Sequence, residues 1–404
     1  MPTETAEERP RVYLNSVHLK GFKSIEDLTI DLKKGLNILI GKNGSGKSNF
    51  MDFIYQAIRI KSNLKASYKY SKLEFNADEQ HSFSIEVERD FFTKSEQEYP
   101  SNRLKFSEKF FIDNKKVFDN SQGSTLTKDF EFQNRQIRYT NISMGLFYIL
   151  GYQNIYSYYL KYSLPDNLAC VDIPGTIKAN TGDGFVFWSF PRVLNFMEEI
   201  LSKVEIFFDE YTEDAEPKNK IENASSSDIL GLLKIQDKTI NNIKLYTNIE
   251  DLRFNGNINL YREDKSVIIE NIKIDFKVNG NWLPWSQLSD GTKRLFYIIS
   301  EITVTDGLIL IEEPELGIHP HQFNLLMDFL KEQSEEKQII ISTHSPKALD
   351  HLSPEELDHI LIAYYDLEKG TQIRHLSDKE ISKAQKYMKE VGFFSDYWML
   401  SDLE

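Results

Sequence analysis

The feature that most constrains this chain is a glycine-rich segment at residues 41–48, which reads Gly-Lys-Asn-Gly-Ser-Gly-Lys-Ser. It fits the pattern G-x-x-x-x-G-K-[ST] of a phosphate-binding loop. The apolar-rich segment 36–40 before it predicts a buried strand, and residues 49–58 after it carry apolar side chains at helical spacing. A strand that turns through glycines into a helix directs backbone N–H groups and the positive end of the helix dipole at one point. The segment therefore predicts a nucleotide-phosphate site in an α/β fold.

The residue types of the loop suit this chemistry. Glycines let the backbone approach the phosphates, because a side chain would hold it away. Lys47 can reach the β- and γ-phosphates, and the Ser48 hydroxyl can ligate Mg²⁺. The flanking strand and helix argue against a chance match in a turn rich in glycine and serine. The candidate nucleotide contacts of the loop are Asn43, Gly44, Ser45, Gly46, Lys47 and Ser48.

Composition limits the classes of function. The 404 residues are enough for two or three domains, or for one large domain with an insertion. A formal net charge of −14 argues against a broad nucleic-acid-binding surface, although a local basic groove remains open. The single cysteine, Cys170, excludes an intramolecular disulfide and fits a reducing cytosol, so we expect a cytoplasmic protein. No run of apolar residues is long enough for a membrane span.

Two more buried strands are predicted in the C-terminal third, each followed by side chains that can carry chemistry. The apolar run 308–311 leads into Glu312 and Glu313, and the run 338–341 is followed closely by His344. Adjacent carboxylates after an apolar strand are costly without a cation, which favours a functional role over a buried ion pair beside a surface acid. Ligands of doubly wound α/β folds bind at the carboxyl ends of strands, so we expect these side chains at one site.

The middle of the chain contains no motif for a known chemistry. Residues 73–140 predict a small antiparallel β-region, whereas residues 143–210 are rich in aromatics and predict helices broken by prolines. The tyrosines there lack the basic neighbours of a base-stacking platform, so core or interface packing is the preferred interpretation. We expect an N-terminal lobe at 1–140, an inserted helical and β subdomain at 141–285, and a C-terminal lobe at 286–404.

Four motifs stand in a fixed order, namely the loop 41–48, Leu288-Ser289-Asp290-Gly291, Glu312-Glu313 after four apolar residues, and Ser342-Thr343-His344. This order resembles the heads of ABC-type ATPases, and within them the branch of SMC, RecF and overcoming-lysogenization-defect (OLD) proteins. Gly21-Phe22-Lys23-Ser24, predicted as a turn with an exposed Phe22-Lys23 pair, and Glu312-Glu313-Pro314-Glu315 favour this branch over transporter ATPases. The implied fold is an α/β P-loop ATPase head with an antiparallel β-region and a largely helical insertion.

The resemblance implies a Mg²⁺-dependent ATPase that converts ATP to ADP and phosphate. Lys47 would bind the phosphates, Ser48 would ligate Mg²⁺, and Glu312 would hold Mg²⁺ through a water molecule. Glu313 would orient or deprotonate the attacking water. His344 would hydrogen-bond the γ-phosphate and report its loss.

The resemblance also implies a homodimer or higher oligomer formed around ATP. Ser289 and Gly291 start a predicted helix, which Ser289 or Asp290 can cap, and they would face the γ-phosphate of an ATP held by a second chain. The loop 317–319 would link the two sites, although His319 is equally well explained as an ordinary surface histidine.

The sequence departs from the family pattern in two respects. The glutamine loop cannot be placed, because Gln122, Gln133 and Gln136 are all candidates and none is flanked convincingly. The 60 residues after His344 predict two strands and a helix, which is too little for the nuclease domain of OLD proteins.

Three functions are compatible with these observations. The preferred one is an ATP-driven switch that controls a separate effector such as a nuclease, in bacterial anti-phage defence, as the resemblance to stand-alone OLD-like heads implies. The alternative is a RecF-like DNA-repair ATPase that binds DNA, against which the acidic charge weighs. A transporter ATPase subunit is the third.

The end of the chain is unusually apolar. Residues 391–400 read Val-Gly-Phe-Phe-Ser-Asp-Tyr-Trp-Met-Leu, whereas chain ends are normally polar. The run either folds back and closes a core or forms a docking patch for another subunit or an effector.

Overall fold

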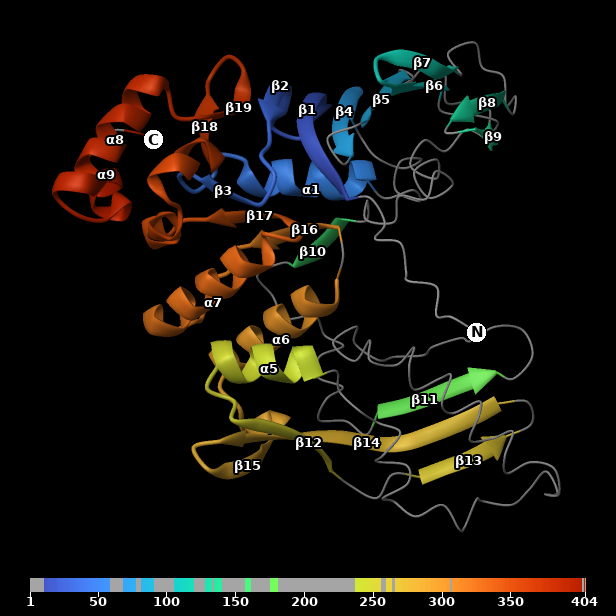
Figure 1. Cartoon of the computed structure of the whole chain (residues 1–404), viewed down its shortest axis with the longest axis vertical. Coiled ribbons are helices and arrows are strands. Elements are labelled where there is room, and N and C mark those ends of the chain that lie inside the picture. Colours follow the sequence, from blue (N-terminus) through green and yellow to red (C-terminus); the bar gives the residue numbers. More distant parts are fainter. Residues whose placement is uncertain are drawn as a thin grey trace. The chain divides into compact units, whose positions relative to one another are not determined.

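The computed structural model describes residues 11–58, 68–77, 81–90, 105–119, 128–132, 134–139, 157–160, 175–180, 237–255, 259–263, 266–305, 307–401 and 403. The chain forms two compact units (Figure 1). The first comprises Met1–Tyr162, Asp306–Glu315 and Leu330–Glu404, and the second comprises the remaining segments, 163–305 and 316–329.

Parallel strands form one half of the large sheet of the first unit. In spatial order they are β10 (Ser157–Leu160), β16 (Leu308–Glu312), β17 (Gln338–Thr343), β3 (Leu36–Ile40) and β18 (Ile360–Asp366). Every residue of β3, β16 and β17 is buried, as expected for strands covered on both faces. Helix α1 (Lys47–Ile58) follows β3 and contacts β10, β16 and β17. The three strands predicted around the motifs are therefore confirmed.

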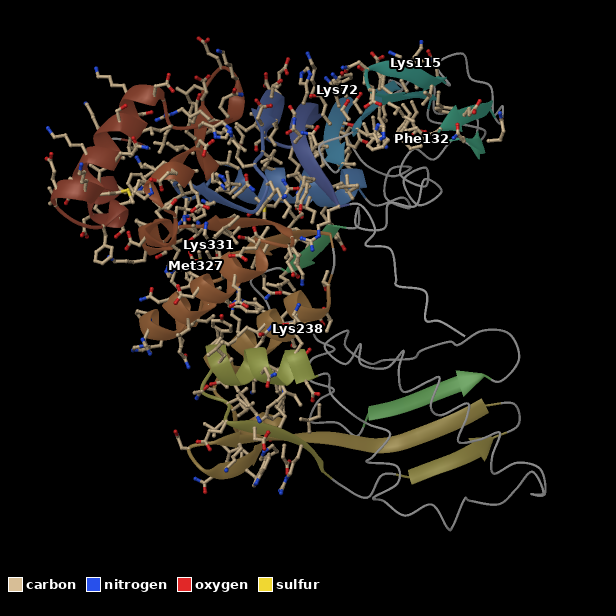
Figure 2. All side chains as sticks on the ribbon, viewed as in Figure 1. Lys72, Lys115, Phe132, Lys238, Met327 and Lys331 are labelled. Atoms are coloured by element: carbon tan, nitrogen blue, oxygen red, sulfur yellow. The ribbon has the colours of Figure 1, made fainter. Side chains whose placement is uncertain are left out.

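The other half of this sheet is mainly antiparallel. Beyond β18 it continues in the order β19 (Gly370–Arg374), β2 (Ile25–Asp31), β1 (Val12–Phe22), β4 (Tyr70–Ala77), β5 (His81–Asp90), β6 (Lys105–Ile112) and β7 (Lys115–Asp119). A separate pair is formed by β8 (Lys128–Phe132) and β9 (Arg135–Tyr139). Phe132 packs against Phe83 of β5, with ring centroids 6.1 Å apart (Figure 2). The antiparallel region predicted from the sequence is confirmed in its described parts.

The turn between β1 and β2 corrects the prediction of an exposed Phe22-Lys23 pair. Phe22 is fully buried, because its ring packs edge-on against Phe53 of α1 at a centroid distance of 5.7 Å. Lys23 reaches the surface at a positive φ of 51°, and its Nζ donates to Asp52 Oδ2 at 2.6 Å. The turn is therefore fastened to the helix that follows the phosphate loop.

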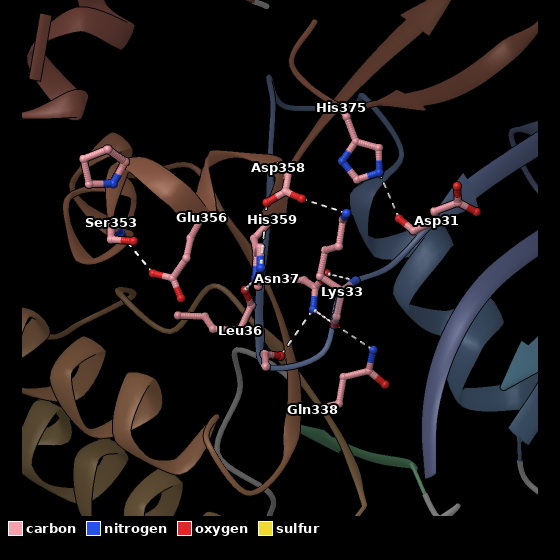
Figure 3. Close-up of polar contacts among 12 residues, drawn as sticks. Asp31, Lys33, Leu36, Asn37, Gln338, Ser353, Glu356, Asp358, His359 and His375 are labelled. Atoms are coloured by element: carbon pink, nitrogen blue, oxygen red, sulfur yellow. Dashed lines mark hydrogen bonds and ion pairs between the residues drawn. The ribbon is translucent and has the colours of Figure 1, made fainter. Parts of the chain in front are cut away.

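Polar contacts fix the N-terminal end of β3, opposite the end that leads into the phosphate loop (Figure 3). His359 Nδ1 lies 2.9 Å from the carbonyl oxygen of Leu36. Asn37 Nδ2 donates to Lys33 O at 2.7 Å, and Lys33 Nζ pairs with Asp358 at 2.7 Å. These contacts tie the strand that leads into the phosphate loop to the short helix η6 (Pro354–His359), which precedes β18.

The C-terminal run folds back onto the first unit. Helix α8 (Asp378–Glu390) leads into α9 (Phe394–Leu400), which contacts the short helix η5 (Pro346–His351). Phe394 and Trp398 are buried, and this supports the core-closing interpretation. A second set of side chains stays exposed, namely Val391, Phe393, Met399 and Leu400.

The second unit contains, in its described residues, a smaller sheet, three complete helices and part of a fourth. Strand β14 (Ser266–Val278) pairs with β11 (Gly175–Asn180), β12 (Asp251–Asn255), β13 (Asn259–Glu263) and β15 (Asn281–Pro284). The helices are α5 (Asp237–Tyr246), η4 (Trp285–Gln287) and α6 (Asp290–Val304). The first ten residues of α7 (Pro320–Gln333) also belong to it, and Met327 is fully buried on this helix (Figure 2).

The structure differs from two expectations for the middle of the chain. The described parts of 143–210 are the strands β10 and β11, not helices, because β10 extends the parallel sheet beside β16; the rest of that stretch lies outside the described residues. The compact units also divide differently from the predicted 1–140, 141–285 and 286–404. Residues 286–305 and 316–329 belong with the inserted segment.

Candidate nucleotide site

The candidate site lies at the carboxyl ends of three adjacent parallel strands, β16, β17 and β3. Their register aligns Glu312 with Ser342, and Ser342 with Leu39. The residues that leave each strand therefore emerge at the same edge of the sheet. This places the phosphate loop, the acidic pair and His344 together, as expected for a parallel α/β sheet.

The phosphate loop is folded around its own lysine. Lys47 is buried, and its Nζ donates to Gly41 O at 2.7 Å and to Lys42 O at 3.1 Å. Gly46 has a φ of 96°, and a Cβ at this position would lie 2.0 Å from Thr371 Oγ1. Only glycine fits there, because the conformation is left-handed and β19 is in direct contact with the loop.

The predicted metal ligands touch each other. Ser48 Oγ donates to Glu312 Oε1, and Tyr159 Oη donates to Glu312 Oε2 at 3.0 Å. Glu312 is 5% exposed. Burial, with the nearby carboxylates of Glu312 and Asp52, raises the pKa of the Tyr159 hydroxyl, so this group is protonated and donates at neutral pH. Both oxygens of the Glu312 carboxylate are thus held.

Glu313 and His344 lie in contact with each other beside the lysine of the phosphate loop. Glu313 adopts a φ of 47°, which is rare for a non-glycine residue, while its N–H donates to Ser342 O at 2.8 Å. His344 Nε2 lies 3.2 Å from Glu313 Oε1, and His344 Nδ1 lies 3.3 Å from Lys47 Nζ. Because the lysine ammonium can only donate, Nδ1 accepts and the ring proton sits on Nε2, facing the carboxylate.

Glu315 holds the turn that carries His344. Its Oε1 accepts from Thr343 Oγ1 at 2.7 Å and from the His344 N–H at 2.9 Å. The Thr343 hydroxyl in turn accepts from the Ser345 N–H at 2.9 Å. A carboxylate two residues after Glu313 therefore links the acidic loop to the histidine loop.

The other predicted loop contacts differ in exposure. Asn43 and Gly44 are exposed, and a Cβ on Gly44 would meet nothing within 4 Å. Ser45 is buried, and its hydroxyl has no hydrogen-bond partner among the described residues. Asn49 Nδ2 donates to Ser24 Oγ at 2.6 Å, and Ser24 Oγ lies 2.7 Å from Thr371 Oγ1.

Ser289 and Gly291 belong to the second unit. Of the two predicted caps, Ser289 and Asp290, Ser289 is the N-cap of α6, and its side chain accepts from the Thr292 N–H at 3.2 Å. A Cβ on Gly291 would lie 2.8 Å from Gly317 O, so the start of α6 requires glycine beside the loop before α7. His319 is exposed, and its Nδ1 accepts from the His321 N–H at 3.3 Å.

Sequence reasoning missed Tyr159, Glu315 and Thr371 as neighbours of the site. Tyr159 lies in an aromatic stretch for which the sequence favours core or interface packing, and only the pairing of its strand with β16 brings it to Glu312.

Within the described ranges, no group of three or more His, Cys, Asp or Glu side chains is arranged to hold a metal ion. No helix in that same part of the chain has the length and apolarity to cross a membrane.

The fold and the cluster define an ABC-type, SMC-like ATPase head. Residues 36–350 match the family model described as "AAA domain, putative AbiEii toxin, Type IV TA system", and the chain belongs to this family.

Curated relatives agree with this class. The "Retron Vc95 probable ATPase" of Vibrio cholerae is 23% identical over 409 aligned positions, which cover 86% of this chain and 73% of that protein. The DNA replication and repair protein RecF of Francisella tularensis subsp. mediasiatica is 32% identical over 68 residues, covering 17% of this chain and 19% of RecF.

A solved structure supports the fold. The Smc head domain of Pyrococcus furiosus, determined with an extended coiled coil and the C-terminal domain of ScpA, matches with a TM-score of 0.50 at 13% identity. The match covers 94% of this chain and 99% of that chain.

Proposed function

We propose that this protein is a Mg²⁺-dependent ATPase that dimerises around ATP and acts as a switch for a separate effector in bacterial anti-phage defence. One observation carries the proposal. Lys47, Ser48, Glu312, Glu313 and His344 lie at the carboxyl ends of adjacent parallel strands. Ser48 contacts Glu312, and His344 lies within 3.3 Å of both Lys47 and Glu313. Residues from distant parts of the sequence thus supply a phosphate-binding lysine, a pair of metal ligands and a general base for phosphoryl transfer to water.

The residues present fit ATP and Mg²⁺. Mg²⁺ in nucleotide sites takes one or two protein oxygen ligands and fills its shell with phosphates and water. The Glu312 carboxylate and the Ser48 hydroxyl, already in contact, supply such a pair. The buried Ser45 hydroxyl has no partner among the described residues, so a phosphate oxygen would satisfy it. When bound, Mg²⁺ supplies charge neutralisation on the β- and γ-phosphates.

Hydrolysis is assigned to Glu313 and His344. The Glu313 carboxylate orients a water molecule and accepts its proton as the water attacks. His344 keeps that carboxylate in place through its Nε2 proton and touches Lys47 through Nδ1. The same ring thus contacts the phosphate-binding lysine and the base, a position suited to sensing the γ-phosphate.

We assign the second half of each site to a partner chain. Ser289 and the N-terminus of α6 present a hydroxyl and a positive dipole end, a combination that binds anions. Because a symmetric dimer repeats each contact, two such half-sites would enclose two ATP molecules. Lys47 and Glu313 then come from one chain and Ser289 from the other.

Mixing two inactive variants tests this arrangement. We expect the Lys47→Ala chain and the Ser289→Arg chain each to be inactive, because each homodimer has two defective sites. Their mixed dimer retains one intact composite site, so a 1:1 mixture should recover about one quarter of the wild-type ATPase rate if chains pair at random and sites act independently. The measurement is phosphate release at a series of mixing ratios.

The matched control is a mixture of Lys47→Ala and Glu313→Gln chains. Both changes lie in the same half-site, so their mixed dimer has no intact site and should stay inactive. A Lys47→Ala and Ser289→Arg mixture that is inactive at every ratio would contradict the composite site.

The role in defence rests on the comparisons. A relative is named as the probable ATPase of a retron, and the family description names a toxin and a type IV TA system. These names support an ATPase that works beside other components, and we carry that arrangement to this chain. The component encoded next to it, above all a nuclease, is the expected effector.

The RecF-like alternative is favoured by the 68-residue match to RecF. It requires DNA binding, with an affinity that falls steeply as salt rises. The net charge of −14 supports the switch instead. Tight, salt-dependent binding of duplex DNA by the ATP-bound chain would reverse this preference.

A further inference from the structure

Strand β10 brings a tyrosine hydroxyl to the proposed metal site. β10 pairs in parallel with β16, and Tyr159 lies level with Leu310, two residues before Glu312 on the same face of the sheet. An aromatic side chain can span this diagonal, and Tyr159 Oη donates to Glu312 Oε2 at 3.0 Å. The contact joins β10, the edge strand of the large sheet, to the acid at the end of β16.

The tyrosine ring is held from its other side. Tyr55 of α1 packs against it, with ring centroids 5.4 Å apart and planes at 59°. Tyr159 is partly buried and packs against the core of the first unit. Its hydroxyl is thus directed at one point, because the ring has a fixed neighbour on the helix.

The two oxygens of Glu312 have separate partners. Oε2 accepts from Tyr159, while Oε1 contacts Ser48 Oγ. A carboxylate anchored at one oxygen presents the other in a fixed direction. Mg²⁺ requires a nearly ideal octahedral arrangement, so the direction of each ligand matters to its affinity.

We propose that Tyr159 is a positioning residue that anchors Oε2 of Glu312 and so aims Oε1, beside Ser48, at the Mg²⁺ of bound ATP. The inference rests on the proposed function and adds to it a residue that the phosphate loop and the acidic pair do not contain. Removal of a hydrogen-bonding partner of a metal-ligating carboxylate typically lowers the metal affinity about 10- to 100-fold.

The test compares Tyr159→Phe with Tyr55→Phe. Tyr159→Phe keeps the ring and its packing and removes only the hydroxyl that reaches Glu312. Tyr55→Phe removes the hydroxyl of the neighbouring ring and leaves the hydrogen bond from Tyr159 to Glu312 in place. Mn²⁺ serves as the probe, and its binding is followed by electron paramagnetic resonance with saturating non-hydrolysable ATP analogue. Binding of the same analogue without metal is measured in parallel.

We expect Mn²⁺ to bind Tyr159→Phe about 10- to 100-fold more weakly than wild type. Tyr55→Phe should bind it like wild type, and metal-free nucleotide affinity should be equal in all three. A purely packing role for Tyr159 predicts wild-type Mn²⁺ affinity in Tyr159→Phe and would overturn the inference while the proposed function stands. If wild type with nucleotide binds no Mn²⁺, the proposed Mg²⁺·ATP site fails, and the role of Tyr159 fails with it.

Discussion

Replacement of Lys47 by alanine is expected to abolish ATP binding. Lys47 is buried at the base of the loop, and its ammonium contacts two loop carbonyls and His344. When ATP binds, the Lys47 ammonium would replace some of these contacts with charge-assisted hydrogen bonds to the β- and γ-phosphates. Hydrogen bonds to charged groups contribute about 1.5–3 kcal/mol each. Loss of the ammonium should therefore lower the affinity for ATP at least roughly 100-fold. Titration with a fluorescent ATP analogue measures the change.

Lys42→Ala is the matched control, because Lys42 is an exposed lysine in the same loop. It removes an equal charge without removing the ammonium that contacts the loop carbonyls. We expect ATP affinity close to that of wild type for this variant. Equal ATP affinities for Lys47→Ala and Lys42→Ala would show that the loop does not bind phosphate as proposed.

Glu313→Gln is expected to keep ATP binding and to lose turnover. The amide has nearly the same shape as the carboxylate but cannot accept a proton from water. A positioned general base contributes about 10²–10⁴ to the rate, so turnover should fall at least roughly tenfold and the Km for ATP should change little. Steady-state phosphate release and nucleotide titration separate the two effects.

Glu335→Gln supplies the control, since Glu335 is an exposed acid in the turn after α7 and outside the cluster. Its rate should equal that of wild type. If Glu313→Gln also hydrolyses ATP at the wild-type rate, Glu313 is not the base, and Glu315 becomes the acid to examine in this loop.

The elements around the site could be predicted from the sequence because each has a local signal. Strand β3 and helix α1 follow from the apolar pattern on either side of the glycine-rich loop. Strands β16 and β17 contain the apolar runs 308–311 and 339–341, which are typical of buried parallel strands. Residue type and position limit the cap of α6 to Ser289 or Asp290, and the cap in the structure is Ser289.

Contacts between distant segments could not be predicted, because they depend on the order of strands in the sheet. β10 lies beside β16 although about 150 residues separate them in the chain, and only this pairing places Tyr159 against Glu312. The prediction of a turn at residues 21–24 places Phe22 at the surface. Phe22 is buried because α1 covers that end of β1.

Glu315 illustrates a different limit. An acid in a loop after a strand is ordinarily a solvated side chain, and no spacing rule distinguishes it. Its role follows only from the turn after β17, whose Thr343 hydroxyl and His344 N–H both point at its Oε1. The left-handed conformation of Glu313 also has no signal in the residue type, since glycine or asparagine is usual there.

The most direct test of the central claim, that two chains close around ATP, is the mass of the Glu313→Gln protein in sedimentation equilibrium. This variant should hold ATP without consuming it. We predict that the mass doubles from that of one 47.2 kDa chain when ATP and Mg²⁺ are added, and that Glu313→Gln combined with Ser289→Arg stays at the mass of one chain. An unchanged mass while ATP is demonstrably bound would contradict the account.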